Sequence, residues 1–152
     1  MSPKYRQAPK AGRVEGHAAK KRLSQNFLHD LNVRDRIVQA GAPVTGEIVL
    51  EIGPGLGFLT EALLASGANV VAVELDSDLI PRLQHKFAAQ ISAGQLRLIH
   101  GDALTVDLES LAPTSGSWRV IANIPYHVTS PLLHRLLLLA VPPARIVLLV
   151  QL

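Results

Sequence analysis

The residues of this sequence best suited to hold a ligand form a glycine-rich segment at positions 51–57 (EIGPGLG). The segment follows an apolar run and precedes a helical pattern that begins at Phe58. Small residues at a strand-to-helix turn let a ligand approach the main chain, and the first turn of the helix offers unpaired N–H groups. Such a turn serves a dinucleotide, another nucleoside ligand or no ligand, so the segment alone leaves the ligand open.

Three details favour S-adenosylmethionine as the ligand of the turn formed by Gly53 and Gly55. Phe58 stands where the dinucleotide pattern G-x-G-x-x-G requires Gly or Ala. Glu51 directly precedes the turn, where a carboxylate repels a pyrophosphate but can attract the ammonium group of a methionine moiety. Glu74 ends the next apolar run, 23 residues after Glu51, where it can accept hydrogen bonds from both ribose hydroxyls. S-adenosylmethionine has the ribose and the ammonium group and lacks a phosphate.

Asp102 ends the third apolar run, within the segment HGDA at positions 100–103. A carboxylate at this place can accept a hydrogen bond from the amino group of the cofactor's adenine. An aspartate here is equally typical of a helix N-cap or a turn. In combination with the glycine-rich segment and Glu74, the cofactor role is the favoured interpretation.

The tetrad Asn123, Ile124, Pro125 and Tyr126 follows the fourth apolar run and has the groups needed to act on an adenine. The exocyclic amine of adenine is a poor nucleophile because its lone pair is delocalised into the ring. The side-chain oxygen of Asn123 and the carbonyl of Ile124 can accept its N–H bonds and localise the lone pair toward a sulfonium methyl. Pro125 favours an extended Ile124. Tyr126 offers a face on which a flipped-out base stacks, worth about 1–3 kcal/mol.

This catalysis requires no metal and no strong base, because S-adenosylmethionine is already an activated electrophile. It would depend on positioning and electrostatics. Taken alone, the tetrapeptide fits a turn with a core tyrosine better. Its place at the carboxyl end of a strand, where open α/β sheets have their sites, favours the catalytic interpretation.

Apolar runs alternating with helical patterns predict the elements that position these residues. We expect strands at 47–52, 69–75, 96–100, 118–122 and 145–152, and helices from Asp30 to about Gly41 and at 58–66, 77–91 and 129–140. Continuous apolar strands separated by helices indicate an α/β, Rossmann-like fold, with a mostly parallel sheet covered by helices on both faces. The last strand would leave an apolar sheet edge exposed.

Composition narrows the class of protein further. The 152 residues suit one globular domain, with 48% hydrophobic and 18% charged residues. The absence of cysteine excludes disulfides and thiolate metal sites and fits a reducing cytoplasm. No apolar run reaches the roughly 18 residues that a membrane span needs, so we expect no membrane partner.

Positive charge is concentrated at the start of the chain. Residues 1–22 hold seven basic side chains and one acidic side chain, a charge of +6, whereas the other residues hold eight basic and eleven acidic groups, a charge of −3. We predict a basic, flexible arm at 1–22 and a cofactor-binding domain at 23–152. The arm suits contact with nucleic-acid phosphates, and a solvated tail is an equal alternative from charge alone.

The ordered motifs resemble those of the KsgA/Erm family of rRNA adenine methyltransferases, from Lys21 to the end of the chain. The motifs are SQNFL at 24–28, the glycine-rich segment, Glu74, GDA at 101–103 and the tetrad at 123–126. The resemblance implies a class I methyltransferase fold and rRNA as the partner. It also implies cofactor contacts from Asn26, Leu28, Gly53, Glu74, Asp102 and Asn123, and a target adenine held by residues 123–126.

Within this family the chain looks closer to the KsgA branch, which dimethylates two adjacent adenines of small-subunit rRNA. The segment FLTE at 58–61 favours that branch, whereas Ser24 favours the Erm branch, which modifies large-subunit rRNA and gives macrolide resistance. Two other functions stay open: a non-catalytic RNA-binding or assembly factor, and a nicotinamide-dependent oxidoreductase, against which Phe58 and the tetrad argue. Family members continue with further strands and a helical domain, and we expect a monomer for the full length.

Overall fold

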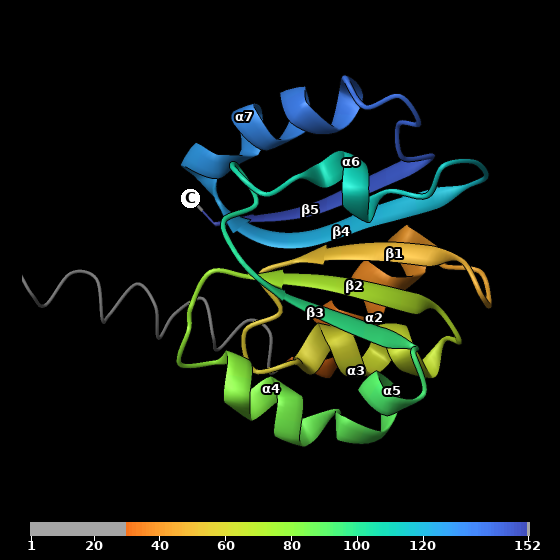
Figure 1. The fold of residues 1–152 in the computed structure, drawn as a ribbon, viewed down its shortest axis with the longest axis vertical. Helices are drawn as coiled ribbons and strands as arrows, with labels where there is room; N and C mark the ends of the chain where they lie inside the picture. The colour runs from red at the N-terminus through yellow and green to blue at the C-terminus, as the bar shows by residue number, and fades with distance from the viewer. Residues whose placement is uncertain (1–29, 152) are drawn as a thin grey trace, which may run out of the picture.

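The computed structural model describes residues 30–151, which form a five-stranded parallel sheet with helices on both faces (Figure 1). The strand order is β3-β2-β1-β4-β5. The strands are β1 (Ile48–Ile52), β2 (Asn69–Glu74), β3 (Leu96–His100), β4 (Trp118–Pro125) and β5 (Arg145–Gln151). The predicted α/β fold with a parallel sheet is therefore confirmed. The predicted arm at 1–22 lies outside the described residues.

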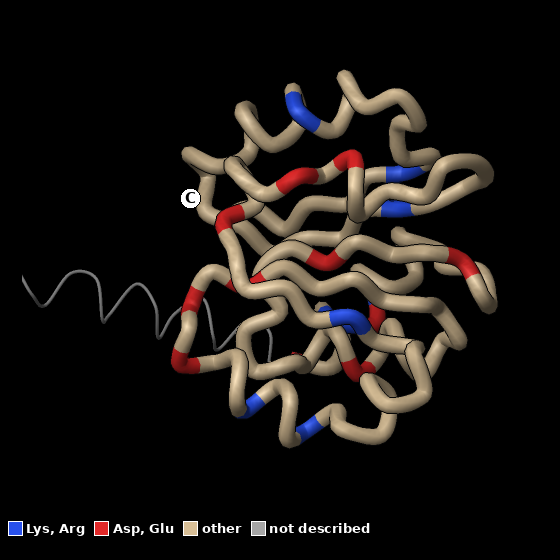
Figure 2. Tube along the Cα trace, in the orientation of Figure 1, with Lys and Arg blue, Asp and Glu red and all other residues tan. Residues whose placement is uncertain are grey.

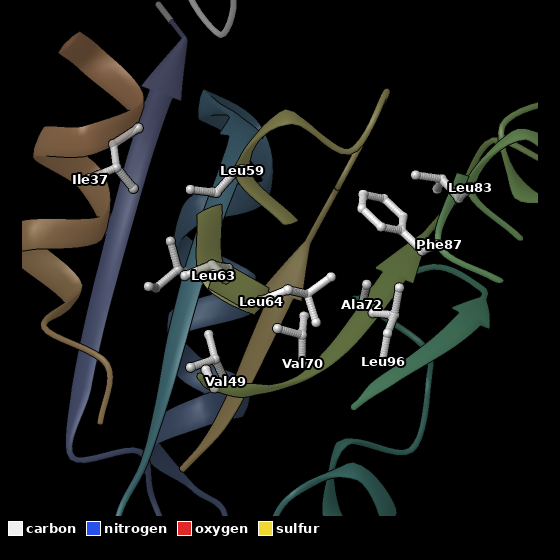
Figure 3. Close-up of a cluster of buried hydrophobic side chains, with 12 residues drawn as sticks. Ile37, Val49, Leu59, Leu63, Leu64, Val70, Ala72, Leu83, Phe87 and Leu96 are labelled. Atoms are coloured by element: carbon white, nitrogen blue, oxygen red, sulfur yellow. The ribbon is translucent and has the colours of Figure 1, made fainter. Parts of the chain in front are cut away.

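Two apolar layers hold the sheet between its helices, and the strands alternate between them. On one face, Val49 and Ile121 pack with α2 (Leu31–Gly41), α3 (Phe58–Ala65) and α4 (Ile80–Lys86), as Figure 3 shows for this cluster. On the other face, Leu50 and Trp118 pack with α6 (Leu108–Leu111) and α7 (Tyr126–Leu137). This alternation follows from the two-residue period of a strand.

The predicted first helix is confirmed, including its cap. Asp30 accepts a hydrogen bond from the Asn32 N–H at 2.9 Å, and α2 ends at Gly41. The left-handed residue after the helix is Ala42, with φ 43°. A Cβ on Gly41 would lie 2.4 Å from the δ-methyl of Ile121, so a larger residue here would force that side chain to move.

Several predicted boundaries are wrong, including the end of the last helix, which is Leu137 instead of residue 140. The helix expected at 77–91 is two helices, α4 and α5 (Ala88–Ser92), because Phe87 leaves helical dihedrals with φ −112° and ψ 26°. Strand β4 continues through Pro125 instead of ending at Ala122, and α7 begins at Tyr126 instead of Thr129. The short helix α6 was not expected at all.

The amino ends of the strands are held by an ion pair remote from the predicted site. Arg119 donates to Glu47 at 2.6 Å, and the two side chains are only 13% and 6% exposed. Burial opposes ionisation of Glu47, yet hydrogen bonds from Arg119, Ser117 and the Val44 N–H hold the pKa of Glu47 below its ordinary value. The functional site must be sought at the opposite, carboxyl ends of the strands.

Candidate cofactor and target-base site

The carboxyl ends of β1, β2, β3 and β4 meet at one edge of the sheet, where the four of the five predicted motifs that fall within the described residues are located (Figure 1). The chain reverses its direction of strand addition at β1, since β2 and β4 pair with β1 on opposite sides. In open α/β sheets the crevice at such a switch point is the usual ligand site. The glycine-rich turn follows β1 directly and therefore lies at this point.

The turn is hydrogen-bonded to the end of β2 on one side and lies close to β4 on the other. The Gly55 N–H donates to the Glu74 carboxylate at 3.0 Å. A Cβ on Gly53 would lie 3.2 Å from the backbone oxygen of Asn123, and the Gly53 φ is +72°. Glycine at 53 thus allows β4 and the turn to approach closely. The structure brings together Gly53, Gly55, Glu74 and Asn123, which the sequence had predicted to act together.

Glu74 is 6% exposed and is held in place by two backbone groups. Its Oε2 accepts the Gly55 N–H, and its Oε1 accepts the Asp76 N–H at 2.8 Å. A carboxylate has about four lone-pair sites, so each oxygen keeps acceptor capacity for a hydroxyl of a ligand. The side chain is fixed before a ligand arrives, which lowers the entropic cost of binding.

Asp102 lies in the loop after β3, beside Glu74. The Gly101 N–H donates to the Glu74 carbonyl at 2.9 Å, which joins this loop to the end of β2. Oδ1 of Asp102 accepts the Leu104 N–H at 2.8 Å in a tight turn. Asp102 can therefore serve both in the turn and in ligand binding. Its Oδ1 accepts the hydrogen bond of the turn, and its other carboxylate oxygen can accept a hydrogen bond from a ligand.

The tetrad forms the junction between β4 and α7. Asn123 and Ile124 belong to β4, Pro125 is the N-cap of α7 with ψ 149°, and Tyr126 is the first residue of the helix. Ile124 is extended, as its place before a proline predicts. Ile124 is 2% exposed and anchors the tetrad, whereas Tyr126 is 68% exposed and presents an open aromatic face. The interpretation of Tyr126 as a core residue is therefore wrong.

Glu51 is buried at the end of β1, next to the glycine-rich turn. It is 1% exposed beneath the glycine-rich turn, and its Oε2 accepts a hydrogen bond from the Thr60 hydroxyl at 2.7 Å. Burial raises the pKa of the Glu51 carboxyl to about 8; the Thr60 hydrogen bond opposes this rise and the charge of Glu74 adds to it. Burial therefore favours the neutral form of Glu51 in the ligand-free chain, and the attraction of Glu51 for an ammonium group stays a prediction.

Two apolar side chains at this edge were not predicted as site residues. Leu75 follows Glu74 and is 67% exposed, and Leu56 in the glycine-rich turn is 41% exposed. Apolar residues in loops at the carboxyl ends of strands are a signal that the sequence contains. They provide surfaces on which a planar ring can rest.

Charge at the carboxyl edge is entirely acidic in the described segments that follow the first four strands. Residues 75–79 (LDSDL) and 101–107 (GDALTVD) contain Asp but no Lys or Arg, and residues 53–57 and 126–130 contain no Asp, Glu, Lys or Arg. Figure 2 shows acidic positions where β2 and β3 end. One cation lies beside these segments, because Lys86 of α4 donates to the Leu56 carbonyl at 3.3 Å. The acidic segments after β2 and β3 favour a ligand with amine and hydroxyl groups there.

Other features of the chain do not contribute to this site in the described structure. Asn26 and Leu28, predicted as cofactor contacts, lie outside the described residues. Hollows in the described surface against α2 and beside β3 hold none of the predicted site residues. Among residues 30–151 there is no cluster of three or more His, Cys, Asp or Glu side chains fit for a metal, and no helix long and apolar enough to span a membrane.

The fold is that of Rossmann-like methyltransferases. The crystal structure of the 23S rRNA methyltransferase ErmE superposes with a TM-score of 0.67 and 27% identity, over 81% of this chain and 48% of that one. A dimethyladenosine transferase from Plasmodium falciparum gives a TM-score of 0.64 and 30% identity, over 78% of this chain and 41% of that one. The predicted class I methyltransferase fold is confirmed.

The sequence identifies the family within this class. Residues 16–152 match the model of the ribosomal RNA adenine dimethylase family, and the chain belongs to that family. The ribosomal RNA small subunit methyltransferase A of Pseudomonas putida is 50% identical over 121 residues, which cover 80% of this chain and 44% of that protein. The chain thus spans less than half the length of this relative. The resemblance stated from the motifs is confirmed.

Proposed function

We propose that this chain is the cofactor-binding part of an rRNA adenine-N6 dimethyltransferase that methylates adjacent adenines of small-subunit rRNA. The observation that carries the proposal is the hydrogen bond of the glycine-rich turn to Glu74 on one side, together with its close approach to the Asn123 backbone on the other. This arrangement supports a single site in which a nucleoside cofactor and a target base meet. The acidic edge supports S-adenosylmethionine, which carries no phosphate.

The proposed mechanism assigns a separate task to each residue. Glu74 accepts hydrogen bonds from the ribose hydroxyls, and Asp102 accepts one from the adenine amino group of the cofactor. Asn123 and the Ile124 carbonyl hold the N–H groups of the target adenine, and Tyr126 stacks on its ring. S-adenosylmethionine supplies the activated methyl group when bound. The chain contributes orientation and hydrogen-bond acceptors aimed where charge develops.

Small-subunit rRNA is the favoured substrate over large-subunit rRNA. The relative named for the small subunit is 50% identical, whereas ErmE, named for 23S rRNA, is 27% identical. Phosphate contacts would come from the basic residues 1–22, since the described edge is acidic. The proposed partner is therefore ribosomal RNA in the cytoplasm.

The test measures methyl transfer to ribosomal particles. Two proteins are compared: the chain alone, and the chain joined to the part of the P. putida protein that the match does not cover. Each is incubated with labelled S-adenosylmethionine and unmodified small or large ribosomal subunits. We expect N6,N6-dimethyladenosine in small-subunit rRNA from the joined protein, and loss of label with Asn123→Ala but not with the exposed control Asn32→Ala. Label in large subunits only would favour the Erm-type activity. RNA binding that is unchanged in Asn123→Ala, without any methylation, would favour a non-catalytic assembly factor.

A further inference from the structure

Arg135 reaches from the last turn of α7 to the loop that follows β3. Its Nη1 donates to the Ala103 carbonyl at 2.5 Å, and its Nη2 donates to the Val106 carbonyl at 2.6 Å. One guanidinium group thus binds two carbonyls of the same loop, 32 and 29 residues earlier in the sequence. The planar fork of arginine suits such paired acceptors, which a lysine ammonium cannot match.

The loop is shaped by its own hydrogen bonds around Asp102. The Asp102 carbonyl accepts the Thr105 N–H at 2.9 Å and the Val106 N–H at 2.8 Å, and Oδ1 accepts the Leu104 N–H. These bonds fix the turn internally and orient the carboxylate. They do not fix the loop relative to the rest of the protein.

Two attachments hold this loop in place at its ends. At its start, the Gly101 N–H donates to the Glu74 carbonyl of β2. At its far side, Arg135 binds the carbonyls, while Ala103 is 7% exposed in the same apolar cluster as Leu132 and Leu136 of α7. The helix that begins with Tyr126 therefore also sets the position of Asp102.

We propose that Arg135 is a positioning residue, which holds the loop so that Asp102 presents a carboxylate oxygen to the adenine amino group of the cofactor. This inference rests on the proposed function, because it takes S-adenosylmethionine as the ligand. Arg135 touches neither cofactor nor target base. It acts through Asp102 and links the cofactor's adenine end to the helix that carries the target-base tyrosine.

The test uses a pair of ligands that differ at the group Asp102 recognises. S-adenosylhomocysteine has the 6-amino group, and S-inosylhomocysteine has a carbonyl there that cannot donate. By titration calorimetry we expect the wild-type chain to prefer the adenosyl ligand by about tenfold or more. Arg135→Met should reduce this preference to about threefold or less, and Arg135→Lys should give an intermediate value.

A matched control separates positioning from general loss of stability. Arg145 also donates to a main-chain carbonyl, that of Ala40 at 2.9 Å, but on the α2 side of the sheet. Arg145→Met should weaken neither the affinity nor the preference. Asp102→Ala should abolish the preference, and adding Arg135→Met to it should change the preference no further, because the residue acts through Asp102.

The outcomes distinguish this inference from the proposed function. A wild-type chain that binds neither ligand would refute the proposed cofactor site. A wild-type chain that binds both equally would refute the contact between Asp102 and the amino group, and with it the positioning role of Arg135. A wild-type preference that persists in Arg135→Met would overturn the positioning role while leaving the cofactor site intact. If Arg135→Met fails to fold, an undiminished preference in Arg135→Lys overturns the role equally.

Discussion

Glu51 should make the stability of this protein fall as the pH rises, and replacing it with glutamine should remove that dependence. The carboxyl is 1% exposed, and its Oε2 accepts the Thr60 hydroxyl at 2.7 Å, while its Oε1 has no hydrogen-bond partner among the described residues. A buried carboxylate without a cationic partner is costly, so the folded chain retains the proton. Glutamine has the same shape and stays neutral at every pH.

The magnitude follows from the difference between the folded and unfolded pKa values. Burial raises the pKa of Glu51 from 4.5 to about 8. Between these values the folded chain holds a proton that the unfolded chain has lost, so unfolding releases a proton. The free energy of unfolding therefore falls with rising pH across this window and levels off above it. At about 1.4 kcal/mol per pH unit, the loss is on the order of 5 kcal/mol.

Urea denaturation from pH 5 to pH 9 measures this effect. Trp118 is the single tryptophan, is fully buried and gives an intrinsic fluorescence signal for unfolding. We expect Glu51→Gln to gain several kcal/mol relative to the wild type as the pH rises. The control Glu61→Gln, on the exposed face of the same helix as Thr60, should not alter the pH profile. Parallel profiles for the wild type and Glu51→Gln would refute the assignment of a buried, protonated carboxyl.

Three further substitutions test the packing and the site. Gly57→Ala should destabilise the fold by more than Gly55→Ala in urea denaturation, because both have positive φ but only at 57 would a Cβ meet an aromatic ring, at 2.5 Å. Arg119→Met should cost about 1.5–3 kcal/mol by the same measurement, since it removes the cationic partner of Glu47, which keeps its hydrogen bonds from Ser117 and the Val44 N–H; a loss below about 1 kcal/mol would contradict a stabilising ion pair. Tyr126→Ala should change stability by about 0.5 kcal/mol or less, because the side chain is 68% exposed. In rRNA-binding measurements, Tyr126→Ala should weaken the binding free energy by about 1–3 kcal/mol. An unchanged affinity would exclude a stacking role.

The sheet could be predicted from the sequence because each strand is an apolar run between a turn and a helix. All five predicted strands are present, with errors at their ends. The ends of elements were harder because tertiary packing decides them. Phe87 interrupts a helical pattern where its ring packs beside Gly57, and β4 extends into the tetrad because β5 pairs with it as far as Pro125.

The site could be predicted in part, for a related reason. Glu74 ends a strand, Gly53 and Asp102 follow strands, and Asn123 lies near the carboxyl end of β4, so the parallel sheet brings all four to one edge. The protonation of Glu51 depends on what covers it, and the role of Arg135 depends on how α7 lies over a loop 30 residues away. Neither follows from spacing. Both require the packed structure.

We propose that the edge of the sheet at the carboxyl ends of β1 to β4 binds S-adenosylmethionine. Ultraviolet cross-linking of labelled S-adenosylmethionine to the chain, followed by mass spectrometry of the labelled peptides, tests it directly. We expect label in peptides containing residues 53–58, 74–79, 101–105 or 123–126, competed by S-adenosylhomocysteine and not by NAD. Label confined to α2 or to the outer edge of β3, or competed by NAD alone, would contradict a site for S-adenosylmethionine at this edge.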